Sequence, residues 1–87
     1  ITTSEVNDAL QELLARRQPA QAAGHEVKLN FARQVETAPP AIVVLGNHPA
    51  LVQEHYIRYL HNGFRERWGF TGNPLRVLMR QKGGRNE

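Results

Sequence analysis

The chain has 87 residues, a net charge of +3 and no cysteine. This length predicts one small domain, because a short chain can bury little apolar area, and the lack of cysteine excludes disulfides and thiolate metal sites. No apolar stretch reaches the ~20 residues that span a membrane, and no secretory signal opens the chain, so we expect a cytoplasmic protein with no membrane partner.

The N-terminal residues predict an amphipathic helix. Thr2 and Glu5 have the spacing of a capping box, with Ser4 as an alternative cap. Apolar residues then recur at helical spacing as far as about Arg16. They are Val6, Leu10, Leu13 and Leu14. Residues 18–25 are predicted to form a flexible connection, to which we assign no chemistry.

Two strands are predicted to follow. In the first, apolar and other residues alternate, which indicates a half-buried strand. The predicted inward residues are Val27, Leu29 and Phe31, and the outward ones are Lys28, Asn30 and Ala32. Two consecutive prolines end this strand, because proline cannot donate ladder hydrogen bonds. The continuous apolar run of residues 41–45 then predicts a central strand, covered on one or both faces.

A second helix and a last strand complete the prediction. Tyr56, Leu60 and Phe64 recur every four residues, and glycines and a proline end the helix. Beyond them Leu75, Val77 and Met79 alternate with Arg76, Leu78 and Arg80, which predicts a strand ending near Lys82. Residues 83–87 are expected to be a frayed tail. The order α-β-β-α-β predicts an α+β two-layer sandwich, a three-stranded sheet with two helices on one face.

A long ordered pattern in the second half of the chain resembles a known family. Residues 56–76 have the form Y-x-R-Y-L-x-N-x-x-R-E-x-x-G-F-x-G-x-P-L-R, and upstream stand Gln34-Val35, Pro39-Pro40 and Asn47-x-Pro49. This order is similar to the C-terminal KH-like domain of the bacterial double GTPases called Der or EngA. The resemblance covers residues 1–81.

The departures from the family pattern are modest. Ala41 and Ile42 stand where Thr and Phe are expected, and Gly46 stands where Val is usual. We expect these changes to lighten strand packing and to leave the order of elements intact.

The resemblance has implications for the whole protein. It implies a KH-like domain over residues 1–82 and two GTPase domains upstream, an arrangement with which Ile1, rather than Met, at the first position agrees. GTP and Mg²⁺ would bind to those domains, and this chain would hold no cofactor. The implied partners are ribosomal RNA in the large ribosomal subunit and the GTPase domains of the same chain.

The positive charge is concentrated in the second part of the sequence. Residues 1–50 have a net charge of −1 and residues 51–87 a net charge of +4. Arg76 and Arg80 share parity on the last strand, so both should project from the open sheet face, about 13 Å apart. The candidate residues for binding RNA or another partner are Lys28, Arg58, Arg65, Arg76, Arg80 and Lys82. The alternative is a solvated basic face that keeps the domain soluble.

Other motifs do not predict a reaction centre. The chain has no phosphate-binding loop with its lysine, one serine at a helix start, and four histidines without metal-ligand spacing. We therefore expect this chain not to be an enzyme. Gly69–Gly72 has the G-x-x-G form of an RNA-clamping loop, but a strand follows it, which favours a helix cap with Phe70 on the core. Tyr59 and Trp68 are possible docking residues, whereas Tyr56 is predicted in the core.

Two functions follow. The first is a non-catalytic KH-like RNA-binding and regulatory domain of a GTPase needed for assembly of the large ribosomal subunit. The alternative is an intramolecular docking domain that controls the GTPase domains without touching RNA.

Overall fold

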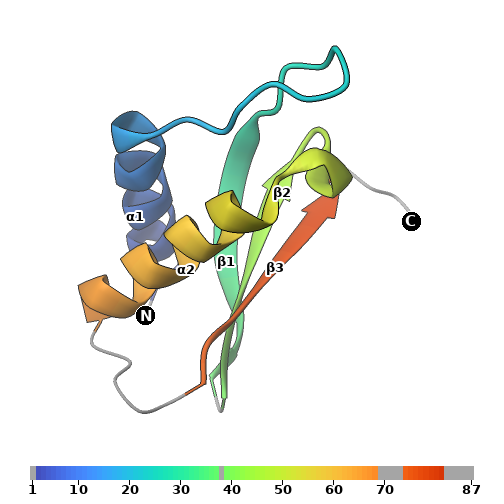
Figure 1. Ribbon diagram of the computed structural model, residues 1–87. Coiled ribbons are helices and arrows are strands. Elements are labelled where there is room, and N and C mark those ends of the chain that lie inside the picture. Colours follow the sequence, from blue (N-terminus) through green and yellow to red (C-terminus); the bar gives the residue numbers. More distant parts are fainter. Residues whose placement is uncertain (1, 38, 69–73, 82–87) are drawn as a thin grey trace.

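The protein forms two layers, a sheet and a pair of helices (Figure 1). The structure is a computed structural model, and it describes residues 2–37, 39–68 and 74–81. The elements follow the order α1, β1, β2, a short 3₁₀ helix η1, α2 and β3. Buried residues of both helices and of one side of the sheet form a single hydrophobic cluster. The α+β sandwich with helices on one face, predicted from the sequence, is confirmed.

The sheet has three strands in the order β1-β2-β3. β1 (Leu29–Thr37) pairs antiparallel with β2 (Pro40–Gly46) through a tight hairpin. β3 (Arg76–Gln81) pairs parallel with β2, because α2 carries the chain back to the same end of the sheet. β2 is thus the central strand, as its continuous apolar run predicts.

Helix α1 (Thr3–Arg16) begins at the predicted capping box. The Thr2 hydroxyl accepts a hydrogen bond from the Glu5 amide at 3.1 Å, and the Glu5 carboxylate accepts one from the Thr2 amide at 2.8 Å. Two orphan amides are satisfied in this way, so Thr2 rather than Ser4 is the cap. The buried stripe includes Ala9, which the apolar spacing did not single out.

Helix α2 (Glu54–Trp68) follows η1 (Pro49–Leu51) and buries the predicted stripe of Tyr56, Leu60 and Phe64. It also contains Gly63, which lies against α1. A Cβ atom at Gly63 would come within 2.4 Å of a Leu13 methyl group. The glycine therefore leaves room for the Leu13 side chain between the two helices. Neither helix in the described part of the chain is long and apolar enough to cross a membrane.

The inward side of β1 differs from the prediction. Leu29 is buried, but Phe31 is 39% exposed and its neighbour Ala32 is fully buried. The register explains the reversal, because Leu29 pairs with Gly46 and Phe31 pairs with the next residue of β2, Leu45. Asn30 is thus the extra residue of a β-bulge, which shifts the alternation by one. The prediction that Phe31 belongs to the core is wrong for this reason.

The end of β2 is packed against the chain that leads into β1. A Cβ atom at Gly46 would lie 2.6 Å from the Lys28 carbonyl oxygen, so the glycine allows a close backbone approach rather than merely lightening the strand. Next to it, the Asn47 side chain accepts a hydrogen bond from the Lys28 amide at 2.9 Å and donates one to the Glu26 carbonyl at 2.8 Å. Asn47 therefore extends the β1–β2 pairing beyond the last strand residue.

Candidate nucleic-acid interface

The sheet has a second face, turned away from the helices. Ala41 and Val43 of the central strand are buried, but neither belongs to the hydrophobic cluster beneath the helices. They alternate with Ile42 and Val44, which do belong to it. Ala41 and Val43 therefore lie on the open face, between their cross-strand neighbours on β1 and β3.

The strand register arranges this open face in three cross-strand rows. Residues directly opposite each other on neighbouring strands point to the same side of a sheet. The rows are Phe31–Leu45–Arg80, Arg33–Val43–Leu78 and Glu36–Ala41–Arg76. Each row carries one arginine, and the three rows carry one acidic residue. The open face therefore combines an apolar middle with a positive border.

Arg76 and Arg80 both lie on this face, as the alternation of β3 predicts. Both are exposed, whereas Leu75 is buried and Val77 and Met79 pack partly against the core. Arg76 donates to the Glu36 carboxylate at 3.0 Å across the sheet, and Arg80 donates to the Met79 carbonyl at 3.1 Å. Because the Arg76–Glu36 pair is half exposed, it contributes at most about 1 kcal/mol to stability and leaves Arg76 accessible.

The other candidate residues do not all join this face. Lys28 is exposed and precedes β1, at the end of the sheet where Phe31 and Arg80 lie. Arg58 and Arg65 lie on α2, seven residues apart and hence on one side of the helix, in the other layer. Lys82 lies outside the described residues. The structure thus separates the basic residues into a sheet group and a helix group.

Arg33 belongs to the sheet group, although the sequence did not single it out. It pairs with Val43 and is exposed. Its outward orientation depends on the bulge at Asn30, because unbroken alternation from Val27 would have turned it inward. The only sequence signal is its charge, which rarely belongs in a core.

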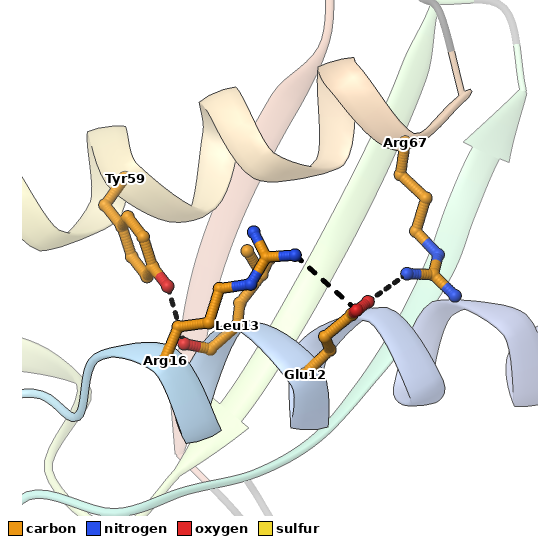
Figure 2. Close-up of polar contacts among 5 residues, drawn as sticks. All are labelled: Glu12, Leu13, Arg16, Tyr59 and Arg67. Atoms are coloured by element: carbon orange, nitrogen blue, oxygen red, sulfur yellow. Dashed lines mark hydrogen bonds and ion pairs between the residues drawn. The ribbon is translucent and has the colours of Figure 1, made fainter.

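The space between the two helices is a second place where charged residues gather. Figure 2 shows Arg67 of α2 and Arg16 of α1 both reaching the Glu12 carboxylate. A shallow pocket there is lined by two arginines and by two acidic residues, Glu12 and Glu66. Since these charges balance, the pocket has no preference for an anion. The Arg67–Glu12 pair joins α2 to α1, whereas the Arg16–Glu12 pair lies within α1.

Two tyrosines hold the C-terminal end of α1. The Tyr59 hydroxyl donates to the Leu13 carbonyl at 2.6 Å (Figure 2), and the Tyr56 hydroxyl donates to the Arg17 carbonyl. The Arg17 guanidinium also lies over the Tyr59 ring, 4.9 Å from its centre. The Arg17 carbonyl lies at the helix end, where carbonyl groups lack intrahelical partners, whereas the Leu13 carbonyl also accepts a hydrogen bond from the Arg17 amide at 3.1 Å. Tyr59, a possible docking residue from the sequence, thus contributes to the packing of α2 on α1.

Trp68 and three of the histidines also make contacts within the fold. Trp68 stacks on buried Phe64 with ring centres 5.8 Å apart. His61 Nε2 lies 2.7 Å from the Leu75 carbonyl oxygen, and the rings of His25 and His48 pack against each other. Among the residues that the structure describes, no three His, Cys, Asp or Glu side chains gather as metal ligands would. The Gly69–Gly72 turn and Phe70 lie outside those residues.

Burial of Tyr56 should make the folded state less stable at alkaline pH. Burial raises the pKa of its phenol from 10.0 to about 12. The folded protein therefore keeps this proton at a pH where the unfolded chain releases it. The stabilisation is complete below pH 10 and is lost as the pH rises to about 12. We expect urea melts to show this decline in the parent chain and a smaller decline in Tyr56→Phe. Equal slopes in the two proteins would contradict the assignment.

The chain is similar in sequence to known bacterial proteins. Residues 1–80 match the family described as the KH-domain-like C-terminal domain of EngA bacterial GTPase enzymes, and the chain belongs to that family. It is 70% identical over 82 residues to the protein named GTPase Der of Gemmatimonas aurantiaca. It is 42% identical over 80 residues to GTPase Der of Halorhodospira halophila and 39% identical over 82 residues to that of Natranaerobius thermophilus.

These alignments cover nearly all of the chain and a small part of each relative. They include 94%, 92% and 94% of the chain, and 19%, 17% and 19% of the three relatives. The chain therefore spans about a fifth of the length of the curated relatives that it matches. The family resemblance found in the sequence pattern is confirmed.

Proposed function

We propose that this chain is a non-catalytic RNA-binding and regulatory domain of a bacterial GTPase that takes part in assembly of the large ribosomal subunit in the cytoplasm. In this proposal GTP and Mg²⁺ bind to domains that lie outside the chain. The chain contributes a binding surface for ribosomal RNA, and the same surface or its neighbours respond to the nucleotide state of the GTPase domains.

The observation that carries the proposal is the open sheet face. It presents Arg33, Arg76 and Arg80, one in each cross-strand row, against the single carboxylate of Glu36. Guanidinium groups suit phosphate oxygens because they donate two parallel hydrogen bonds and stay charged. The sheet layer therefore offers a broad positive surface that suits an RNA backbone.

A purely intramolecular role is the second candidate, and one observation favours it. The apolar residues Phe31 and Val35 are 39% and 41% exposed on β1. Exposed apolar side chains beside arginines are common where protein surfaces meet. In this alternative the same face packs on a GTPase domain of the parent protein and does not bind RNA.

The experiment that tests RNA binding is a salt titration. Neutralising phosphates releases counterions, so the affinity for RNA should fall steeply as salt increases. We expect the 87-residue chain to bind ribosomal RNA at low salt and to lose roughly 10³-fold or more in affinity between 50 and 200 mM salt if six or more phosphates are contacted. Fluorescence anisotropy with labelled RNA measures this. Absent binding at low salt, or binding that salt does not weaken, would favour the docking alternative.

A further inference from the structure

Phe31 has an unusual position for an aromatic residue of this chain. The bulge at Asn30 turns its side chain out of the core, and it is 39% exposed on the open face. The other described aromatic residues are occupied by the fold. Tyr56 and Tyr59 donate hydrogen bonds to α1, and Phe64 is fully buried beneath Trp68. The aromatic surface of the sheet therefore comes from Phe31.

The surroundings of Phe31 are cationic. Arg80 lies in the same cross-strand row, two strands away, and Arg33 lies two residues along β1 on the same face. By strand spacing and rise these Cα positions are within roughly 10 Å and 7 Å of Phe31. Lys28 stands at the same end of the sheet. A ring between guanidinium groups can take a base on its flat surface while the cations hold the adjoining phosphates.

We infer that the open sheet face binds single-stranded RNA, with an unpaired base stacked on Phe31 and the flanking phosphates held by Arg33 and Arg80. This inference rests on the proposed function and narrows its ligand to unpaired nucleotides. The faces of bases in a duplex are covered by their neighbours, so a duplex would meet the arginines and leave the ring unused. Each row carries one arginine, and the three rows together carry one acidic residue, Glu36. This positive charge favours an anionic RNA strand over a second copy of this basic chain as the occupant of the face.

The test compares two short RNAs of equal length with the 87-residue chain at low salt. One is single-stranded and contains 2-aminopurine, whose fluorescence is quenched when it stacks, and the other is a duplex. We expect tighter binding and quenching with the single strand. Phe31→Ala should weaken single-strand binding roughly tenfold and remove the quenching, because base–aromatic stacking is lost. Phe31→Trp should retain both.

Two further variants keep the result interpretable. Val35→Ala removes the other exposed apolar side chain of β1 and should leave the quenching unchanged. Phe31→Leu keeps an apolar side chain without an aromatic ring, so it should fold, lose the quenching and bind the single strand roughly tenfold more weakly. Circular dichroism reports whether each variant folds, and the leucine variant carries the test if the alanine variant does not.

The other possible outcomes distinguish stacking on Phe31 from RNA binding in general and from self-association. Equal affinity for duplex and single strand, or unchanged binding by Phe31→Leu, would overturn stacking on Phe31 and leave RNA binding by the basic face intact. No binding of either RNA would overturn the proposed function as well. A dimer in sedimentation that Phe31→Ala dissociates would assign the face to a second copy of the chain.

Discussion

Truncation of Phe64 to alanine is expected to cost about 3–5 kcal/mol of folding stability, and truncation of Leu60 about 2–5 kcal/mol. Both side chains are fully buried on the inward stripe of α2. Phe64 also stacks with Trp68, so its removal opens a cavity and takes away a ring contact. A domain with a total stability of roughly 5–15 kcal/mol should lose much of it. Urea or thermal melts followed by circular dichroism measure the change.

The matched control for these truncations lies on the same helix. Asn62 is exposed between the two core residues, and Asn62→Ala should change stability by no more than about 0.5 kcal/mol. A Phe64→Ala protein that melts with the parent would show that this stripe does not form the core.

The second large effect concerns binding. Replacing both Arg76 and Arg80 by glutamate is expected to leave the fold largely intact, because both are exposed and the Arg76–Glu36 pair is worth at most about 1 kcal/mol. The same change turns the sheet face from positive to negative, so association with RNA at low salt should be abolished. Anisotropy measures the binding, and a melt verifies the fold.

Arg58→Glu with Arg65→Glu is the matched control, since it makes the same change in net charge on α2, in the other layer. If binding depends on the sheet face, this variant should retain most of the affinity at a given salt concentration. Equal losses in the two double variants would indicate that total charge, rather than the sheet face, attracts the RNA. Unfolding of the Arg76/Arg80 variant would show that these arginines are structural.

The elements predicted best from the sequence are those in which the helical or strand periodicity of apolar residues is unbroken. The four-residue spacing of Tyr56, Leu60 and Phe64 gave the phase of α2, and the parity of Arg76 and Arg80 gave the outer face of β3. Both patterns depend on local backbone geometry alone. The capping box at Thr2 is equally local, and it is present as predicted.

The features that sequence reasoning missed depend on a partner element. The bulge at Asn30 is defined by the pairing of β1 with β2, so the outward positions of Phe31 and Arg33 could not follow from the alternation in one strand. Likewise Gly63 and Tyr59 acquire their roles from the distance between α1 and α2. The places of Phe31 and Arg33 in the candidate interface therefore could not be predicted from the sequence, whereas the outward positions of Arg76 and Arg80 could.

Site-specific crosslinking tests most directly whether the open sheet face meets RNA. A photoreactive amino acid is placed at Leu78, which lies in the middle row of the face beside Val43, in the full-length protein bound to large ribosomal subunits. The same probe at exposed Asn62 on α2 serves as the comparison. We expect crosslinks from position 78 to ribosomal RNA. Crosslinks from position 78 to the GTPase domains of the same chain, with no RNA captured, would contradict this expectation.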